Sequence, residues 1–372
     1  MNCGRPAMKI IHVIDSLEVG GAERIVAHLC RLHRQQGHDP AVCCLMSLGA
    51  LGGELLGEGF EVDVLQATRT DAAIWRLRAY LRRRQPDVVH AHNLFAIWAA
   101  CIPARRTGAV VVGTRHGLCA PAGAREIRHA LATRCCDWTV AVCDATARNL
   151  AATPLAAKQR IVRIYNGAAV SSSGPSSAHP GRFTLVTVGR LDPTKDQATM
   201  LAALKIAAAR VPDIRLLIVG GGKLEPALHA QAAASGLADC VVFCGEQREV
   251  EPFLRTAHVF VLSSVSEGLP LSLLEAMACR LPVIVTSVGG MAEVVERSGC
   301  GQVVPPRHPA ALAEAIVKYA QHRELLPALR HRSYESFLQH FTVERMASEY
   351  MALYGSVARG REPTIALLSH AG

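Results

Sequence analysis

The chain contains two successive series of short β-branched runs that alternate with longer segments of helical periodicity. The first series occupies residues 9–15, 41–46, 60–65, 87–92, 109–116, 137–143 and 160–167. The second occupies residues 182–191, 214–222, 240–245, 258–264 and 281–287. Strands that alternate with helices favour parallel sheets covered by helices on both faces. We therefore expect an α/β protein with two doubly wound, Rossmann-like domains whose strand ends face a central cleft.

A polar stretch, SSSGPSSAHPG at 171–181, separates the two series and is typical of a linker. We place the first domain at 1–172, the linker at 173–181 and the second domain at 182–340. Three helices are predicted after the strand at 281–287, with no further strand, and they occupy residues 309–320, 324–339 and 343–357. These helices must pack outside the second domain or return to the first, and we assign 341–372 as closing helices that return to the first.

The charge is unevenly distributed along the 372 residues. Residues 1–175 hold 21 Lys and Arg against 13 Asp and Glu, whereas the remaining residues hold 19 against 18. A basic first half indicates an anionic partner, such as a phospholipid surface or a phosphorylated substrate. Nucleic acid is disfavoured, because aromatic residues make up only 5% of the chain and no recognition motif is present.

Cysteine usage and hydropathy indicate a cytoplasmic protein. The thirteen cysteines include no C-x-x-C and no zinc-type spacing, so we expect reduced, buried thiols and no metal centre. No apolar stretch approaches the roughly 20 residues that span a bilayer. The N-terminus also lacks a signal-peptide core before Ile10.

The most informative segment, residues 263–290, follows a buried strand and opens a helix at Gly268, Leu269 and Pro270. Proline at a helix start leaves the amides of Leu271 and the next residue free to bind a phosphate.

Two carboxylates, Glu267 and Glu275, flank this phosphate site. Because a phosphate repels carboxylates, we expect both side chains to accept hydrogen bonds from sugar hydroxyls on either side of a diphosphate. The alternative for Glu267 is an ordinary acid that complements the helix dipole.

A second constellation is VGRLDPTKD at 188–196. Gly189 ends a strand, and Arg190 and Lys195 follow it. The two cations would neutralise a departing diphosphate, as a metal does elsewhere. The alternative is a surface pair with Asp192 or Asp196. No D-x-D motif occurs in the chain, so metal-bridged chemistry is disfavoured.

The turn at Gly20 and Gly21 opens a helix after the first strand, where backbone could approach phosphates closely. A plain loop is the alternative. No G-x-G-x-x-G fingerprint is present, which argues against a nicotinamide-dependent oxidoreductase.

These motifs resemble glycosyltransferase family 4, the retaining nucleotide-sugar enzymes of GT-B fold that assemble bacterial-type glycans. The resemblance is specific in GRLDPTKD and SEGLPLSLLEAMACRLPVIVTSVGGMAEVV, with their Glu-x7-Glu pair. It is looser in VGGAERIV, VVHAHN, TRHG and IYNG, and the tail FTVERMASEYMALYGS resembles the family's closing helices. It covers nearly the whole chain.

The resemblance implies a role for each matching residue. Arg190 and Lys195 would hold the donor diphosphate, with the amides at 268–271 and the turn at 20–21 closing on it. Glu275 would bind the ribose, and Glu267 the donor sugar. His116 matches the family's histidine beside the anomeric centre.

The implied reaction moves a hexose-type sugar from a nucleotide sugar to a hydroxyl of a glycan or lipid-linked glycan, with retention and without a metal. We expect a UDP-sugar first and GDP-mannose second. A front-face route is implied, in which the leaving phosphate helps to deprotonate the acceptor. A nucleotide-sugar epimerase, a sugar phosphorylase and a catalytically idle binding subunit remain alternatives.

Two features concern the acceptor. His90, His92 and Asn93 end a strand of the first domain and are candidates to line the acceptor site, or are ordinary loop residues. The helix at 74–84, IWRLRAYLRRR, combines apolar and arginine residues, which indicates either contact with an anionic membrane, at the inner face of the cell membrane, or a solvated helix face.

Overall fold

The computed structural model describes residues 7–117, 124–170 and 181–357. The chain divides into two compact units, of which the first comprises residues 1–166 and 343–372 and the second residues 167–342. Our sequence-based end of the first domain at 172 and start of the second at 182 lie six and fifteen residues later. The predicted linker, apart from Gly181, lies outside the described residues.

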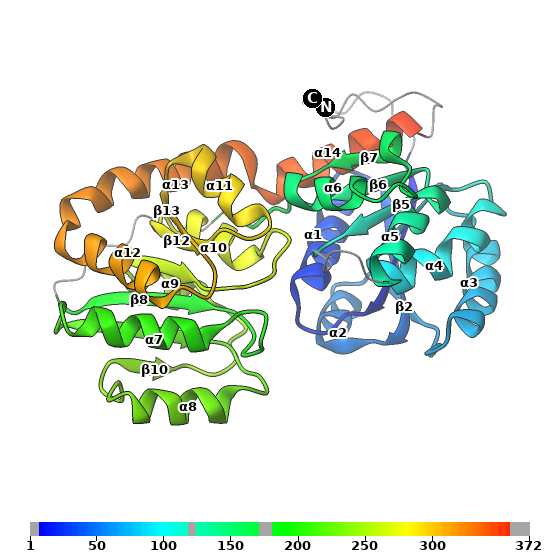
Figure 1. The fold of residues 1–372 in the computed structure, drawn as a ribbon. Coiled ribbons are helices and arrows are strands. Elements are labelled where there is room, and N and C mark those ends of the chain that lie inside the picture. The colour runs from blue at the N-terminus through cyan, green and yellow to red at the C-terminus, as the bar shows by residue number, and fades with distance from the viewer. Residues whose placement is uncertain (1–6, 118–123, 171–180, 358–372) are drawn as a thin grey trace. The chain divides into compact units, whose positions relative to one another are not determined.

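The first unit is built on a seven-stranded sheet of order β3-β2-β1-β4-β5-β6-β7, and every paired strand is parallel to its neighbour. The strands are β1 (Lys9–Ser16), β2 (Asp39–Ser47), β3 (Glu61–Val64), β4 (Val88–His92), β5 (Val110–Arg115), β6 (Trp138–Ala141) and β7 (Ile161–Arg163). The helices are α1 (Gly21–Gln35), α2 (Gly49–Gly57), α3 (Thr70–Arg84), α4 (Asn93–Arg105), α5 (Ala124–Cys135), α6 (Asp144–Ala151) and α14 (Val343–Val357) (Figure 1).

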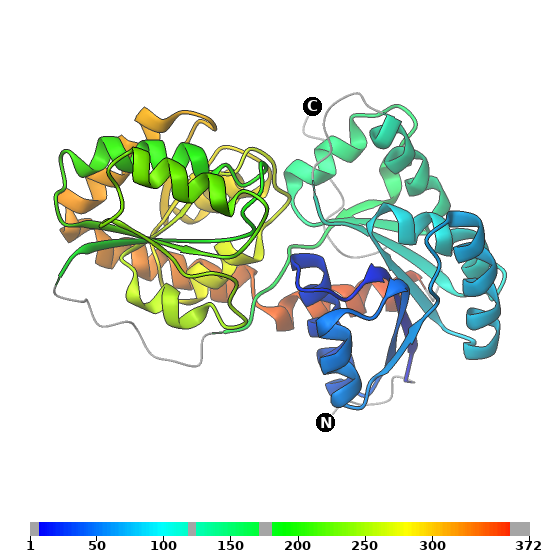
Figure 2. The same cartoon turned by 90° about the horizontal axis from the view of Figure 1, so that it is seen from below.

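The second unit is built on a six-stranded parallel sheet of order β10-β9-β8-β11-β12-β13. Its strands are β8 (Phe183–Val188), β9 (Ile214–Val219), β10 (Val241–Phe243), β11 (Val259–Leu262), β12 (Val283–Thr286) and β13 (Gly301–Val304). Its α-helices are α7 (Gln197–Ala208), α8 (Glu225–Ala234), α9 (Glu251–Thr256), α10 (Leu271–Ala278), α11 (Gly290–Ser298), α12 (Pro309–Gln321) and α13 (Leu326–His340). Helices lie on both sides of this sheet (Figure 2).

Strand β13 corrects our expectation that no strand follows residues 281–287. It pairs in parallel with β12 at the edge of the sheet. Its four residues begin with Gly301 and include only two valines, and an edge strand is buried less than a central one. A periodic apolar signal was therefore weak at this position.

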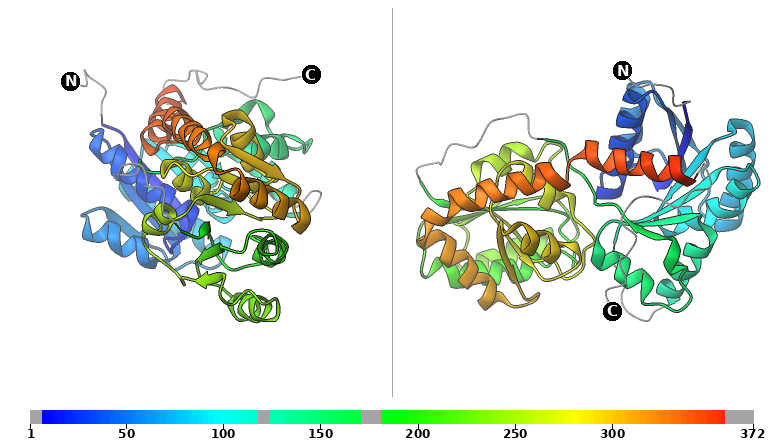
Figure 3. Two further views of the ribbon diagram at one scale, coloured as in Figure 1. Left: turned by 90° about the vertical axis from the view of Figure 1, so that its left-hand side faces the viewer. Right: turned by 90° about the horizontal axis from the view of Figure 1, so that it is seen from above.

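The last helix, α14, packs against α1 of the first unit (Figure 3). Tyr350 and Tyr354 on α14 are fully buried. Tyr354 Oη lies 2.6 Å from His90 Nδ1, and Tyr350 Oη lies 3.1 Å from Thr114 Oγ1. Two buried hydrogen bonds thus fix the closing helix to strands β4 and β5.

The described cysteines are free thiols, most of them buried. Within the described ranges, none of the helices combines the length and the apolar content that a membrane-spanning segment requires.

Candidate active site

Several of the predicted site residues follow the carboxyl ends of strands beside a topological switch point, which is where ligands bind in open parallel sheets. In the first sheet the strand order switches between β1 and β4, and in the second between β8 and β11. Gly20, Gly21 and Asn93 follow the strands at the first switch point. Lys195 and Glu267 follow the strands at the second.

Lys195 and Glu267 form an ion pair within the second unit. Lys195 Nζ lies 2.5 Å from Glu267 Oε1, and the two side chains are 17% and 11% exposed. Ser264 Oγ donates a further hydrogen bond of 2.8 Å to the same carboxylate oxygen. Because both partners are largely buried, removal of either would leave a poorly solvated charge.

Backbone contacts hold the two loops of this pair together. The Val265 amide donates to the Thr194 carbonyl at 2.8 Å, and Ser263 Oγ donates to the carbonyls of Lys195 and Asp196. Gly289 packs against the same loop with φ +57°, and a Cβ there would lie 2.1 Å from the Glu267 carbonyl oxygen. Only glycine fits this approach.

Arg190 is placed differently from Lys195. Its side chain is 81% exposed, and its Nε lies 3.4 Å from Asp192 Oδ2, which is the surface pairing that we weighed as an alternative. Gly189 lies beneath Lys195, since a Cβ there would lie 3.5 Å from Lys195 Cε. The structure thus joins Gly189, Lys195 and Glu267 and leaves Arg190 at the surface.

The predicted phosphate site is the start of α10. Pro270 is the N-cap of this helix, in extended conformation, and no side chain caps it. Gly268 and Leu269, which precede it, are buried, as is Leu271 at its first position. Glu275 lies partly buried in the second turn.

The turn at Gly20 and Gly21 opens α1. Gly20 is its N-cap in extended conformation and makes no side-chain cap. A Cβ at Gly20 would lie 2.2 Å from a carboxylate oxygen of Glu23, whereas Gly21 has open space around it. A carboxylate therefore lies against the backbone that we expected to approach phosphate.

The histidines at the ends of β4 and β5 are brought together, but not as we expected for an acceptor site. His92 Nδ1 lies 3.1 Å from His116 Nε2. His90 and His92 are fully buried, which corrects the expectation that they line a cleft. His90 and His92 point to the same face of β4, because alternate residues of a strand share a face. On that face, His90 and Thr114 are hydrogen-bonded to tyrosines of α14.

His12 of β1 was not predicted from the sequence as a site residue. It is the register partner of His90, is fully buried, and places Nδ1 3.1 Å from His92 Nε2. The available signal was one polar residue within the apolar run KIIHVID. Nothing in the sequence pairs residues 12 and 92, which lie on different strands.

His12, His90 and His92 have ring nitrogens within 4.8 Å of one another, a spacing that a metal ion could bridge. Those of His90 already contact Thr114 and Tyr354. Those of His92 contact His12 and His116. Hydrogen bonding within the described residues thus accounts for these nitrogens without a metal, and of the three rings only His12 Nε2 is left over.

His116 lines a pocket of about 970 Å³ at the carboxyl edge of the first sheet. Arg115, which is 2% exposed, shapes the turn around it by donating to the Gly117 carbonyl at 2.9 Å and to Asn149 Oδ1 at 2.7 Å. The apolar walls come from α3, α4 and α5 and comprise Ile74, Leu94, Phe95, Trp98, Ile102 and Leu131. Besides Arg115 and His116, the polar residues that line the same pocket are Asp15, Thr70, Asn93, Arg128 and His129.

Asp15 lines this pocket and is a second residue that was not predicted from the sequence. Its Oδ1 is buried without a hydrogen-bond partner in the described part of the chain. Burial, with the nearby Glu23 carboxylate, raises the pKa of Asp15 to about 6. A carboxylate with a vacant acceptor atom beside apolar walls can bind a hydroxyl group.

The basic helix α3 buries most of its apolar side chains within the protein. Leu77, Tyr80 and Leu81 are buried, and α3 packs against α4. Trp75 is 69% exposed, and Arg82 and Arg83 are exposed beyond it.

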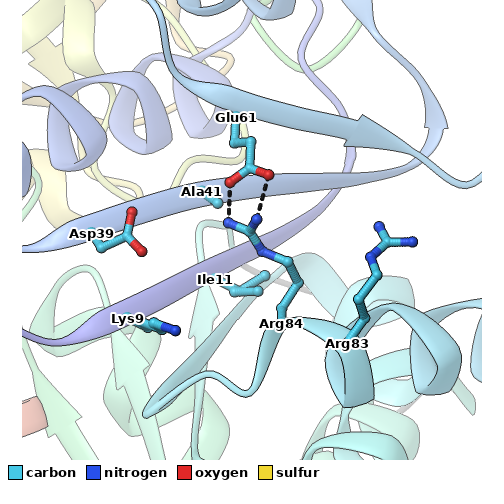
Figure 4. Close-up of a pocket in the computed structure, with 7 residues that line it drawn as sticks. All are labelled: Lys9, Ile11, Asp39, Ala41, Glu61, Arg83 and Arg84. Carbon is cyan, nitrogen blue, oxygen red and sulfur yellow. Dashed lines mark hydrogen bonds and ion pairs between the residues drawn. The ribbon is translucent and has the colours of Figure 1, made fainter.

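Arg84, at the end of the same helix, pairs with Glu61 in a small pocket at the opposite edge of the sheet (Figure 4). Lys9, Asp39 and Glu61 there mark the amino ends of β1, β2 and β3. The pocket measures about 190 Å³. It therefore lies away from the strand ends that carry the candidate site.

Two parallel α/β units with these strand orders in one chain define the GT-B fold. Residues 19–171 match the family described as Glycosyltransferase Family 4, and residues 182–322 match the family described as Glycosyl transferases group 1. The chain belongs to glycosyltransferase family 4.

Relatives cover the chain in part. It is 31% identical over 147 residues to N-acetyl-alpha-D-glucosaminyl L-malate synthase of Bacillus anthracis, which is 40% of this chain and 39% of the synthase. It is 25% identical over 311 residues to one subunit of the phosphatidylinositol N-acetylglucosaminyltransferase of Arabidopsis thaliana, covering 78% and 70%. The match to the synthase thus spans well under half of that relative's length.

Solved structures with the same fold cover nearly the whole chain. Anabaena Alr3699/HepE in complex with UDP has a TM-score of 0.82 at 19% identity, covering 94% of this chain and 100% of that one. Sucrose-phosphate synthase from Thermosynechococcus elongatus has a TM-score of 0.80 at 18% identity, covering 95% and 100%. At these identities the likeness concerns the fold.

Proposed function

We propose that this protein is a retaining glycosyltransferase that moves a hexose-type sugar from a nucleotide sugar to a hydroxyl of a glycan or lipid-linked glycan. The observation that carries the proposal is the buried Lys195–Glu267 ion pair at the switch point of the second sheet. The Lys195 ammonium lies there beside the Glu267 carboxylate, which can accept a hydrogen bond from a hydroxyl group. Both lie in the same unit as the start of α10 at Leu271, where no side chain caps the helix. The solved neighbour in complex with UDP supports a UDP-sugar as the first donor to test, before GDP-mannose.

The second unit is the proposed donor site. Lys195 Nζ would move from Glu267 to the diphosphate as the nucleotide binds, with Arg190 as the second cation. Glu267 would then accept a hydrogen bond from the donor sugar, and Glu275 from the ribose. Positive charge that is already in place stabilises the departing diphosphate without a metal.

The first unit is the proposed acceptor site. The pocket beside His116 joins apolar walls to Asp15 and Asn93, which suits an acceptor with a sugar hydroxyl and an apolar part. Asp15 Oδ1 would accept the hydroxyl hydrogen bond. With retention by a front-face route, the leaving phosphate takes the acceptor proton, so no enzymic nucleophile is required.

Thermal shifts and turnover test the proposal. A panel of UDP-, GDP-, ADP- and dTDP-sugars is titrated into the protein, and we expect one nucleotide class to raise the Tm because it binds only the folded state. Lys195→Ala should weaken that donor's binding by about 100-fold, as expected when a buried cation is removed from its anion, and Glu275→Ala should also weaken it. His116→Ala should reduce turnover more than binding.

Lys205→Ala and Glu249→Ala are the controls, because these exposed side chains lie outside the site. Wild-type turnover by all three site variants would refute the assignment. Free sugar and nucleotide released without acceptor would indicate an epimerase, and a requirement for phosphate would indicate a phosphorylase. Nucleotide binding without any turnover would indicate a binding subunit. Turnover that is lost in EDTA would contradict the metal-free route.

A further inference from the structure

Three imidazoles form a continuous hydrogen-bonded line from the pocket into the core of the first unit. His116 Nε2 lies 3.1 Å from His92 Nδ1, and His92 Nε2 lies 3.1 Å from His12 Nδ1. His12 and His92 are fully buried. At the inner end, His12 Nε2 is buried with no hydrogen-bond partner among the described residues. At the outer end, His116 Nδ1 is the other ring nitrogen that the two hydrogen bonds of the line do not use.

All three rings are neutral at neutral pH. Burial lowers the pKa of His12 to about 3 and that of His116 to about 4. The pKa of His92 is also well below its usual range, because of burial and then the neighbouring histidines. A neutral imidazole has one N–H donor and one acceptor nitrogen. The two hydrogen bonds of the line therefore permit only two proton arrangements.

In the outward arrangement, His12 Nδ1–H donates to His92 Nε2, and His92 Nδ1–H donates to His116 Nε2. This leaves an N–H at His116 Nδ1 and a bare acceptor at His12 Nε2. The inward arrangement reverses every donor and places an N–H at His12 Nε2, in the core and without an acceptor. A buried, orphaned N–H is rarer in proteins than an under-satisfied acceptor, so the burial of His12 favours the outward arrangement.

We propose that His12 and His92 are positioning residues that hold His116 as its Nδ1–H tautomer, so that His116 offers a hydrogen-bond donor rather than a base to the substrate. The ligand atom it would contact is an oxygen with a free lone pair, such as a sugar hydroxyl or a phosphate oxygen. This role in catalysis rests on the proposed function, whereas the tautomer itself does not. Other polar side chains of the pocket are those of Asp15, Thr70, Asn93, Arg115, Arg128 and His129.

The tautomer is measured directly by NMR on protein labelled with ¹⁵N at histidine, because protonated and bare ring nitrogens have distinct ¹⁵N shifts. We expect protonated Nδ1 and bare Nε2 for His12, His92 and His116. His116→Ala assigns the His116 signals. A protonated His116 Nε2 in the wild-type protein would overturn the proposal.

A matched pair of variants tests the origin of this preference. His12→Asn retains a donor near the position of Nδ1 and should keep the His116 tautomer and turnover close to wild type. His12→Leu removes that donor, and should shift His116 toward the Nε2–H form and lower kcat by about tenfold, with the donor KM little changed. His33→Leu is the packing control, since His33 stacks on His12 at 5.9 Å outside the line.

The outcomes separate the two proposals. If folded His12→Leu protein keeps the wild-type tautomer of His116, the hydrogen-bonded line does not determine that tautomer and the proposal is overturned. If His12→Leu fails to fold, His92→Leu provides the same test. The Nδ1–H tautomer of His116 in the wild-type protein, together with full turnover by His116→Ala, would leave the line standing and refute the catalytic role of His116. Stoichiometric zinc or another metal in the purified protein, lost in His12→Asn, would overturn the hydrogen-bonded line in favour of a metal site.

Discussion

At the residue scale, the candidate site contains a side chain, that of Asp15, that lowers the stability of the folded state. Asp15 is a carboxylate with a buried oxygen that has no partner among the described residues, and its pKa is raised to about 6, chiefly by burial. A raised pKa means that the folded state holds the proton more tightly than the unfolded chain. The destabilisation is therefore absent below about pH 4, grows as the pH rises to about 6, and is complete above it.

Asp15→Asn should consequently stabilise the protein at pH 7.5 and impair acceptor use. We expect a gain of about 1–2 kcal/mol in the free energy of unfolding, a value discounted for partial solvent exposure, and little gain at pH 4. The acceptor KM should rise because the amide no longer accepts as a carboxylate does. Denaturant melts at both pH values and steady-state kinetics measure these effects, with the exposed Asp213→Asn as control. Equal gains at both pH values would contradict the pKa argument.

Gly289 supports the donor site through its backbone, and Gly299, at the other end of α11, provides a comparison. Both have positive φ, +57° and +58°, but ψ is −140° at Gly289, a conformation that strongly favours glycine, and +26° at Gly299, in the left-handed helical region. Alanine at Gly299 meets no atom nearer than 3.5 Å, whereas at Gly289 it would lie 2.1 Å from the Glu267 carbonyl oxygen.

We expect Gly299→Ala to cost about 1 kcal/mol, the strain of alanine in this conformation, with nucleotide binding unchanged. Gly289→Ala should cost about 2–3 kcal/mol or more and weaken nucleotide binding, because the loop of Glu267 must shift. Calorimetric unfolding and nucleotide titration measure both effects. Equal effects of the two substitutions would contradict a structural role for the close approach of Gly289 to the Glu267 carbonyl.

At the element scale, buried strands were the easiest feature to predict. A parallel strand covered on both faces is a continuous apolar run, so the runs at 9–15 and 214–222 mark β1 and β9. The edge strand β13 gives no such signal. The motifs around Glu267 were visible because each is contiguous in sequence. The pairing of Lys195 with Glu267, and of His12 with His92, depends on strand order, which no local pattern encodes.

Helix α3 shows how tertiary contacts narrow a prediction made from composition. Its apolar residues pack against the protein, so a membrane contact would rest on Trp75 with the exposed Arg82 and Arg83. We expect the protein to bind vesicles that contain anionic phospholipid at low salt, with each arginine contributing roughly 1 kcal/mol to the free energy of binding. The Arg82→Ala/Arg83→Ala variant should lose most of it in a sedimentation assay.

Lys205→Ala/Lys223→Ala is the control, because it removes the same charge from exposed positions of the second unit. If both double variants sediment like the wild type, α3 is an ordinary solvated helix. If both lose binding equally, net charge rather than α3 is responsible.

At the scale of the whole molecule, the buried histidines set a limit on stability in acid. His12, His33, His90 and His92 have no exposed surface, and burial holds the pKa of each well below 6.5. The unfolded chain protonates these rings near pH 6.5, whereas the folded first unit does not. Folding stability is therefore fully present above that pH and is lost progressively below it.

Each such histidine should remove up to about 1.4 kcal/mol of stability per pH unit below 6.5. We expect amide hydrogen exchange to accelerate in β1 and β4 between pH 6.5 and 5, after correction for intrinsic exchange, ahead of β8 and β9 of the second unit. His33→Leu should reduce the acid sensitivity of β1 and β4 by the share of one histidine, because it replaces a buried imidazole by an apolar side chain. Parallel acceleration in both sheets, unchanged by His33→Leu, would assign acid unfolding to carboxylates across the chain instead of to this cluster.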